Sequence, residues 1–320
     1  MPKPKIIFIV GPTASGKTDL GLALAKKFNG EIVSADSRQV YIGMDIGTGK
    51  EVRSEKLKVK SSEGMWTVND VPVYLYDVRK PDEKFSLAEY QQLALEKIKD
   101  IHARDKLPIL VGGTGLYIQA VTEGLKIPKV APDQNLRVKL ENQTLESLLV
   151  ELEKVDPVYF EKVDKNNKRR VVRALEVYQQ TGETFSSLQK KYKVPFDILK
   201  VGLKADREDL YQRNDKRIEK WFEIGFVEEV KNLLKTYSID LPAMTSLGYR
   251  QIAAYIKGNL GLPEAKQRIK FDFHGYIRAQ LTWFKRDSNI YWYDISVENF
   301  ESEIRELVSQ WLTGEESARI

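Results

Sequence analysis

The chain has 320 residues, a formal net charge of +5 and a composition of 42% hydrophobic and 30% charged residues. This length is sufficient for one large or two modest domains with a buried core. Because the sequence contains no cysteine, it excludes a disulfide framework, a thiolate nucleophile and a cysteine-based zinc site. His102 and His274 are the only histidines, so metal chemistry would use oxygen ligands, which suits Mg²⁺.

The first apolar run covers residues 6–10 and ends at Gly11 and Pro12. It is too short for the core of a signal peptide or for a membrane span, so we expect a cytoplasmic protein without a membrane partner. The mildly basic net charge permits a nucleic-acid partner but does not require one.

The residues after this run fit the pattern Gly-x-x-x-x-Gly-Lys-Ser/Thr, which predicts a loop that binds a phosphate chain. In such a loop the glycines let backbone N–H groups point at anionic oxygens, the lysine neutralises the outer phosphates and the threonine hydroxyl ligates Mg²⁺. The predicted loop consists of Gly11, Pro12, Thr13, Ala14, Ser15, Gly16, Lys17 and Thr18. A helix over residues 17–28 should follow it.

Apolar or alternating runs are separated by helical patterns, which predicts a parallel sheet covered by helices. These runs are residues 6–10, 31–34, 73–78 and 107–111. The last run leads into a second glycine-rich turn at 112–115, and both glycine turns should face one crevice at the carboxyl ends of the strands. Asn69 and Asp70 fit a hairpin turn between residues 65–68 and the third run.

Beyond residue 122 the sequence becomes charged and helical, with breaks at prolines. We therefore expect an α/β fold with a P-loop NTPase-like parallel sheet flanked by helices and an inserted helical domain. Its parts are a core over residues 1–122, the helical insertion over 123–196 and a return to the core over 197–320. The last part should add strands at 198–203 and 290–295.

Three polar residues follow predicted strands or glycine turns. Asp36 comes after the second run, where its carboxylate would lie beside the phosphate loop as a general base, a metal ligand or the cap of the next helix. Thr114 is suited to hydrogen-bond an oxygen of a phosphate ester or to stabilise a tight turn. Asp77 is suited to bind Mg²⁺ through water or to serve a turn alone.

The clearest basic cluster lies on a predicted helix that begins near Asn167. Arg169 and Arg173 share a face at i, i+4 spacing, and Arg170 lies beside them. Such a stripe suits phosphodiester contacts, although many charge runs are solvated helix faces. A second region, residues 276–286, mixes cations with aromatic residues and suits either base stacking or a core helix.

Seven sequence blocks occur in the order found in bacterial tRNA dimethylallyltransferases, and the chain resembles that family from residue 5 to about residue 295. The blocks are the phosphate loop and residues 34–41, 43–48, 111–117, 169–177, 247–250 and 280–284. The resemblance implies transfer of a dimethylallyl group from dimethylallyl diphosphate to the exocyclic amine of the adenosine just 3′ of the anticodon in tRNA. It implies that Asp36 is the general base, that Thr114 lies near the bridging oxygen, and that Lys17, the loop and Mg²⁺ hold the diphosphate leaving group.

The resemblance also implies which positions contact tRNA. They are Asp36, Ser37, Arg38, Gln39, Thr114, Arg137, Arg169, Arg170, Arg173, Thr245, Gly248, Tyr249, Arg250, Arg278, Gln280 and Trp283. Arg213 and Arg217 match a helix that carries arginines near the diphosphate. The helical insertion would grip the anticodon stem-loop, the target base would leave its stack to reach Asp36, and we expect a monomer.

The sequence departs from the family pattern in several places. Val73 and Tyr74 stand where the family has two histidines, after an apparent insertion around residues 61–69. Residues 49–51 read Gly-Lys-Glu in place of Ala-Lys-Pro, and Ala279 replaces an arginine that is common before Gln280. These changes remove the family histidines, and one phosphate contact is either missing or supplied by Arg278.

The residues alone leave three alternative functions open. One is a phosphate-loop kinase that binds ATP and phosphorylates a small metabolite, and another is an enzyme that prenylates free adenine nucleotides. Both leave the basic insertion without a role. The third is a non-catalytic, nucleotide-gated RNA-binding protein in which Asp36 is only a cap.

Overall fold

The computed structural model describes residues 3–50, 58–128, 130–189 and 192–315. The chain forms two compact units, which we call the core unit (Met1–Ile118 with Pro195–Ile320) and the helical unit (Gln119–Val194). The division expected at residues 123 and 196 differs from these boundaries by a few residues. Glu51, in the altered Gly-Lys-Glu motif, lies outside the described residues.

One sheet organises the core unit, and its described strands run in the order β3-β4-β5-β2-β6-β1-β7-β8. They are β1 (Lys5–Val10), β2 (Gly30–Ser34), β3 (Val59–Ser62), β4 (Met65–Val68), β5 (Val71–Tyr74), β6 (Leu107–Val111), β7 (Asp197–Lys204) and β8 (Ile290–Asp294). Pairing is parallel from β5 to β8, whereas β3, β4 and β5 form an antiparallel meander. Ile9 and Ser34 both pair with Val111, so β1, β2 and β6 end level with one another.

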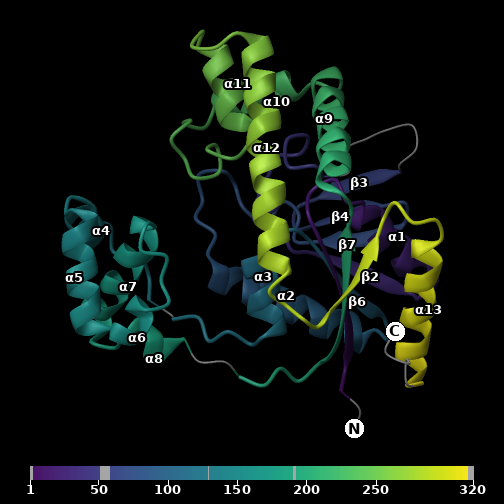
Figure 1. Ribbon diagram of the computed structural model, residues 1–320. Helices are drawn as coiled ribbons and strands as arrows, with labels where there is room; N and C mark the ends of the chain where they lie inside the picture. The colour runs from purple at the N-terminus through teal and green to yellow at the C-terminus, as the bar shows by residue number, and fades with distance from the viewer. Residues whose placement is uncertain (1–2, 51–57, 129, 190–191, 316–320) are drawn as a thin grey trace. The chain divides into compact units, whose positions relative to one another are not determined.

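Helices cover both faces of this sheet. α1 (Lys17–Lys27) and α13 (Phe300–Thr313) share one apolar cluster with β1, β2 and β6, and α2 (Leu87–Ala103) packs on the other face (Figure 1). The central strands are buried on both sides, which explains why they read as continuous apolar runs rather than alternating ones. α3 (Gly115–Thr122) follows β6 and crosses the boundary between the two units.

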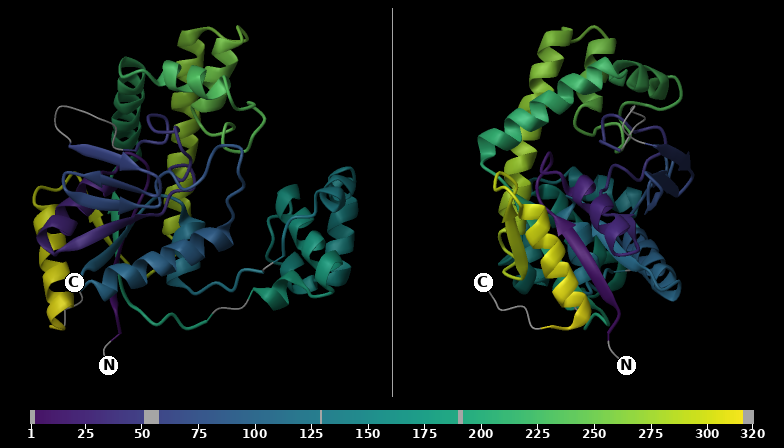
Figure 2. Two further views of the ribbon diagram at one scale, coloured as in Figure 1. Left: turned by 180° about the vertical axis from the view of Figure 1, so that it is seen from behind. Right: turned by 90° about the vertical axis from the view of Figure 1, so that its right-hand side faces the viewer.

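A second apolar cluster of the core unit holds the loop after β2. It is built by α9 (Arg207–Glu223), α10 (Phe226–Leu234), α11 (Tyr249–Ile256) and α12 (Leu262–Phe284). The first three of these helices lie around the long α12 helix (Figure 2). The loop residues Val40 and Met44 are completely buried in this cluster with Trp221 and Phe226. The loop that carries Asp36 is therefore anchored on a packed helical layer.

The helical unit has its own core. It contains α4 (Gln134–Glu141), α5 (Leu145–Val155), α6 (Pro157–Phe160), α7 (Lys168–Thr181) and α8 (Phe185–Leu188). Leu148 and Leu152 of α5 pack against Val171 and Leu175 of α7. α7 begins after Asn167 as expected, and the Asn167 side chain caps it by accepting a hydrogen bond from the N–H of Arg170.

The third predicted strand is wrong at its carboxyl end. The prediction was residues 73–78, but β5 ends at Tyr74 because Leu75 and Asp77 have φ angles of 66° and 53°. The predicted hairpin is confirmed: Asn69 and Asp70 have φ angles of 49° and 67°, as a type I′ turn requires, and join β4 to β5.

None of the described helices is long and apolar enough to cross a lipid bilayer.

Candidate active site

Three loops meet where β1, β2 and β6 end. The N–H of Gly112 donates to Ile9 O at 3.2 Å, the N–H of Ala35 donates to Val111 O at 2.8 Å, and the N–H of Thr114 donates to Ala35 O at 3.2 Å. Gly112 is required for this approach, because an added Cβ would lie 2.2 Å from Ala35 O. The glycine turns and the Asp36 loop therefore face one crevice, as the strand pattern indicated.

The first loop, Gly11 to Thr18, turns directly from β1 into α1. Gly11 and Gly16 have φ angles of 144° and 83°, which favour glycine, and a Cβ on Gly11 would lie 2.5 Å from Leu203 O of β7. The helix begins at Lys17, and its first turn directs unpaired backbone N–H groups toward the loop. This arrangement suits an anionic ligand.

Lys17 lies at the centre of the positive charge in this region. Its Nζ donates to Pro12 O at 2.6 Å. Burial and the nearby Arg217 guanidinium lower the pKa of Lys17 to about 7, although Asp36 opposes this effect. Arg213 and Arg217 lie one turn apart on α9 and also act on Asp19. Burial raises the pKa of Asp19, and the two guanidinium groups oppose this rise. The α9 arginines therefore face the phosphate loop, where the family pattern expects them.

Asp36 and Thr114 lie next to each other across two loops. Asp36 Oδ1 accepts a hydrogen bond from the N–H of Arg38 at 2.8 Å, and Thr114 Oγ1 accepts one from the N–H of Ser37 at 3.1 Å. Asp36 does not cap a helix, since the chain after it forms turns. Among the residues that the structure describes, Oδ2 of Asp36 accepts no hydrogen bond.

A polar pocket combines these groups with side chains that sequence reasoning missed. The predicted residues that line it are Thr13, Lys17, Thr18, Asp36, Gln39, Arg217 and Gln280. The missed residues are Ile32, Tyr76 and Val111, which supply apolar surface, and Thr48 and Gly49. The sequence signals for the last two were the family block at residues 43–48 and the altered motif at residues 49–51.

Gln280 and Trp283 of α12 connect the glycine turns. Gln280 is buried, its Oε1 accepts from the N–H of Thr13 at 2.8 Å, and its Nε2 donates to Gly113 O at 3.0 Å. Trp283 packs so closely on Gly115 that an added Cβ would lie 2.2 Å from its Nε1. Both side chains support the pocket, and direct contact with tRNA stays a prediction.

Tyr276, in the region that mixes cations with aromatic residues, was not among the predicted site residues. Burial and the Asp36 charge raise the pKa of Tyr276, while hydrogen bonds with Thr114 and Gln280 oppose the rise. Its hydroxyl therefore lies beside the two residues that carry the proposed chemistry.

The block around residues 245–250 is part of the packed layer rather than of the pocket. Tyr249 is completely buried and its hydroxyl donates to Glu229 Oε1 at 2.6 Å, while Glu229 Oε2 accepts from the N–H of Ile46 at 2.7 Å. Arg250 is exposed and pairs with Asp272 at 2.5 Å.

Four further residues predicted to contact tRNA make contacts inside the core unit. Arg38 Nη1 and the Thr245 hydroxyl both donate to Pro242 O at 2.9 Å, and Gly248 begins α11 with a φ angle of 88°. Arg278 donates to the Tyr211 hydroxyl at 2.9 Å and is exposed. Their contact with tRNA stays a prediction.

The arginines of the helical unit divide into two kinds. Arg137 Nε and Nη2 donate to the two oxygens of the buried Glu176 at 2.8 and 3.0 Å, and Arg173 Nη1 donates to the same carboxylate at 2.5 Å. Although burial opposes ionisation, these hydrogen bonds lower the pKa of Glu176. Arg169 and Arg170 are exposed. The three arginines therefore do not form one exposed stripe. Arg173 binds Glu176 inside the helical unit, and Arg169 and Arg170 face solvent.

Asp77 does not join the pocket as a metal ligand, since both of its carboxylate oxygens bind other side chains of the chain. Oδ1 pairs with Lys50 and Oδ2 accepts from Trp66 Nε1 at 2.6 Å. Burial raises the pKa of Asp77, and Lys50 opposes this.

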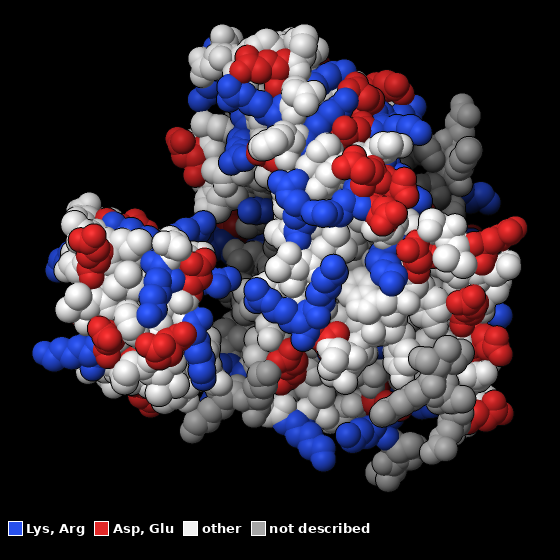
Figure 3. Space-filling view, in the orientation of Figure 1, with Lys and Arg blue, Asp and Glu red and all other residues white. Residues whose placement is uncertain are grey.

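Charges of both signs are interspersed on the face of the molecule in Figure 3. The mild excess of positive charge therefore does not by itself define a binding surface. Specific residues must carry the assignment.

Comparison with known proteins identifies the family of the chain. The family model described as IPP transferase matches residues 39–287. A protein of Dehalococcoides mccartyi that is named tRNA dimethylallyltransferase is 43% identical over 317 residues, which cover 97% of this chain and 94% of that protein.

Solved structures give the same result. The tRNA isopentenylpyrophosphate transferase of Bacillus halodurans is 36% identical, with a TM-score of 0.72 over 98% of each chain. A eukaryotic dimethylallyltransferase acting on tRNA is 26% identical, with a TM-score of 0.81 over 99% of this chain and 81% of that one. With the phosphate loop, Asp36 and Thr114 gathered at one edge of the sheet, the chain belongs to the tRNA dimethylallyltransferase (IPP transferase) family.

Proposed function

We propose that the protein transfers a dimethylallyl group from dimethylallyl diphosphate to N6 of the adenosine just 3′ of the anticodon in tRNA. The observation that carries this proposal is the position of Asp36, whose carboxylate lines the same pocket as Lys17 and Thr18 of the phosphate loop. A phosphate loop alone fits many nucleotide enzymes, whereas this pairing fits attack by an amine on a carbon attached to diphosphate.

The proposed reaction breaks the bond between the allylic carbon and the bridging oxygen and forms a bond from that carbon to N6. The electron pair of the broken bond leaves with diphosphate, and the N6 proton passes to Asp36. The amine is a weak nucleophile because its lone pair is shared with the adenine ring, so removal of its proton is valuable. Thr114, held one hydrogen bond from the Asp36 loop, is suited to donate to the bridging oxygen.

The leaving group collects negative charge, and the pocket places cations around it. Lys17 and Arg217 line the pocket, and Arg213 lies close enough to the loop that a Cβ on Gly16 would be 3.9 Å from its Nη2. Fixed positive groups of this kind stabilise charge that develops during a reaction.

The pocket also fits Mg²⁺ that is bound mainly through phosphate oxygens and water. Thr18 lines it, and the described residues contain no cluster of three histidine or acidic side chains that would form an all-protein site. Thr18 would hold the ion, which when bound neutralises charge on the departing diphosphate.

We infer that the partner is the anticodon stem-loop of tRNA. We also propose that the protein acts in the cytoplasm and as a monomer. Arg169 and Arg170 are exposed cations at the start of α7, which is fixed to α5 by an apolar core. This placement suits contacts with phosphodiesters, and the target base must leave its stack to reach Asp36.

A transfer assay tests the proposed activity. The protein is incubated with Mg²⁺ and dimethylallyl diphosphate labelled in its dimethylallyl group, together with either unmodified tRNA or AMP. We expect label in the tRNA, at the adenosine next to the anticodon, and none in AMP. Label in AMP alone would identify an enzyme of free nucleotides, and label in neither would contradict the transfer.

Asp36→Asn should lower kcat by about 10²–10⁴-fold and leave the Kd for tRNA within a few fold, because the carboxylate is needed mainly in the transition state. Single-turnover kinetics and tRNA-binding titrations measure the two quantities. Asp105→Asn is the matched control, since Asp105 is exposed and precedes β6, at the end of the strand opposite to the pocket. An equal loss of tRNA affinity would make Asp36 a recognition residue instead.

Lys17 should take up a proton when diphosphate binds above neutral pH. Its pKa is about 7, so the free side chain is charged below pH 7 and mostly neutral at pH 8, while the anionic ligand favours the charged form. Titration calorimetry in two buffers should show an uptake of roughly 0.9 proton at pH 8 that falls toward zero at pH 6, relative to Lys17→Arg. Equal uptake by wild type and Lys17→Arg would show that Lys17 does not titrate there.

Arg169→Ala combined with Arg170→Ala should flatten the log–log salt dependence of tRNA binding by about one to two units, because each lost phosphate contact removes about 0.9 unit. Lys139→Ala combined with Lys154→Ala removes two exposed cations from the same unit and should change the slope much less. A slope that both pairs leave unchanged would return Arg169 and Arg170 to a solvated helix face.

A further inference from the structure

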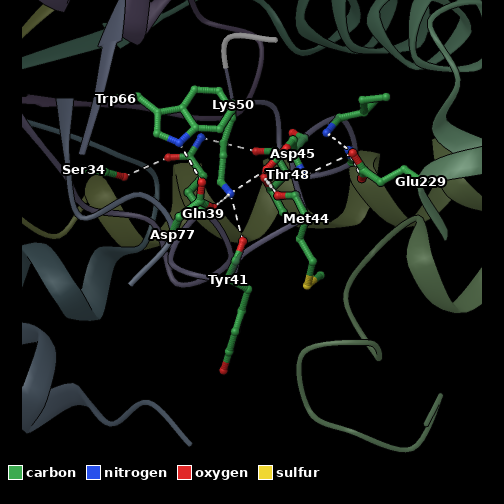
Figure 4. A network of polar contacts seen from close by, with 12 residues as sticks. Ser34, Gln39, Tyr41, Met44, Asp45, Thr48, Lys50, Trp66, Asp77 and Glu229 are labelled. Carbon is green, nitrogen blue, oxygen red and sulfur yellow. Dashed lines mark hydrogen bonds and ion pairs between the residues drawn. The ribbon is translucent and has the colours of Figure 1, made fainter. Parts of the chain in front are cut away.

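Lys50 is a buried lysine next to the residues Thr48 and Gly49, which form one wall of the pocket. Lys50 comes after Gly49, its side chain is fully buried, and its Nζ donates to Tyr41 O at 2.8 Å, to Asp45 Oδ1 at 2.8 Å and to Asp77 Oδ1 (Figure 4). An ammonium group has three protons, so these acceptors use its full capacity. Because a buried charge is costly unless it is paired and hydrogen-bonded, this cluster defines the position of Lys50 closely.

Asp77 connects this cluster to the hairpin of β3 and β4. Its Oδ2 accepts from Trp66 Nε1 at 2.6 Å, and Lys50 Nζ lies 5.4 Å from the centre of the Trp66 ring. The N–H of Asp77 donates to Gln39 O at 3.2 Å, and the N–H of Gly64 donates to Asp77 O at 3.1 Å. Asp77 lies beyond the end of β5 with a φ of 53°, and its side chain points to Lys50.

Gln39 and Gly49 couple the cluster to the pocket. Gln39 lines the pocket, and its Nε2 donates to the carbonyl oxygens of Thr48 and Gly49 at 3.3 and 3.4 Å (Figure 4). Gly49 has a φ of 68° and lies so close to Arg217 that an added Cβ would be 1.7 Å from its Nη2. Lys50 therefore anchors residues 48–49, the wall of the pocket that the Arg217 guanidinium contacts.

We propose that Lys50, Asp77 and Trp66 are positioning residues for the diphosphate: they hold the wall at residues 48–49, and through it Arg217, in the place that binds the ligand. They act through this wall and do not touch the reacting atoms. The proposal rests on the proposed function, because it takes the diphosphate of the donor substrate as the ligand. It also gives the segment that departs from the family pattern a role, which is to supply the Trp66 indole.

Trp66→Phe is the most direct variant, because it keeps an aromatic ring and removes the N–H donor to Asp77 together with the second ring of the indole. We expect the Kd for inorganic diphosphate with Mg²⁺ and the KM for dimethylallyl diphosphate to rise about five- to tenfold, as for the net contribution of one typical hydrogen bond. The kcat and the Kd for tRNA should stay near wild type when they are measured well below the melting temperature of the variant. Trp292→Phe makes the same change on β8, at the other end of the sheet order, and should alter none of these quantities.

Asp77→Asn separates positioning from metal binding. A positioning role predicts weaker diphosphate binding with an unchanged Mg²⁺ concentration for half-maximal activity at saturating donor substrate. A metal ligand would instead raise that concentration by roughly tenfold or more.

Hydrogen exchange in the wild-type protein does not depend on the folding of any variant. The N–H groups of Gly49 and Lys50 donate to Ile46 O and Asp45 O, and the binding of diphosphate with Mg²⁺ should slow their exchange by about fivefold or more. Unchanged exchange on binding, variants that bind diphosphate as wild type does, or a shifted Mg²⁺ requirement would each overturn the positioning role. If wild type binds no diphosphate, the proposed function itself fails.

Discussion

The level ends of β1, β2 and β6 are the constraint on which the rest of the structure depends. Backbone hydrogen bonds continue past the strands, from Ala35 to Val111 and from Thr114 back to Ala35. Ile9 and Ser34 both pair with Val111, and this register brings the loops that follow the three strands to one level. The phosphate loop, Asp36 and Thr114 are therefore placed before a ligand arrives, which reduces the ordering cost of binding.

Cationic side chains serve two purposes in this protein, and their number does not distinguish them. Arg137 and Arg173 pair with the buried Glu176, and Lys50 pairs with the buried Asp77 and the partly exposed Asp45, so these cations stabilise the fold around them. Lys17 carries its charge at the pocket instead, where burial and Arg217 shift its pKa. A buried ion pair that loses one partner leaves an uncompensated charge, which is why the structural cations tolerate change poorly.

The segment that differs most from the family pattern is also joined to the site. β4 brings Trp66 onto Asp77, and Asp77 in turn contacts both Lys50 and the backbone of Gln39. A hairpin at one end of the sheet is thereby linked through short polar contacts to a wall of the pocket. The two family histidines that are absent here are not needed for this connection.

The sequence by itself determined the features that depend on neighbouring residues. The phosphate loop, the buried strands, the Asn69–Asp70 turn and the cap of α7 all follow from local preferences of glycine, apolar runs and short polar side chains. The family resemblance added the expected roles of Asp36, Thr114 and the arginines of α9.

Only the tertiary structure decided which polar side chains are available for binding. Arg137 reaches Glu176 because α4 packs against α7, and Gln280 bridges Thr13 and Gly113 because α12 lies beside both glycine turns. The same holds for the early end of β5, where the contact between Asp77 and Lys50 overrides an apolar pattern that would continue the strand. These pairings join residues that are distant in the chain, so no local pattern encodes them, and burial of a charge then selects its partner.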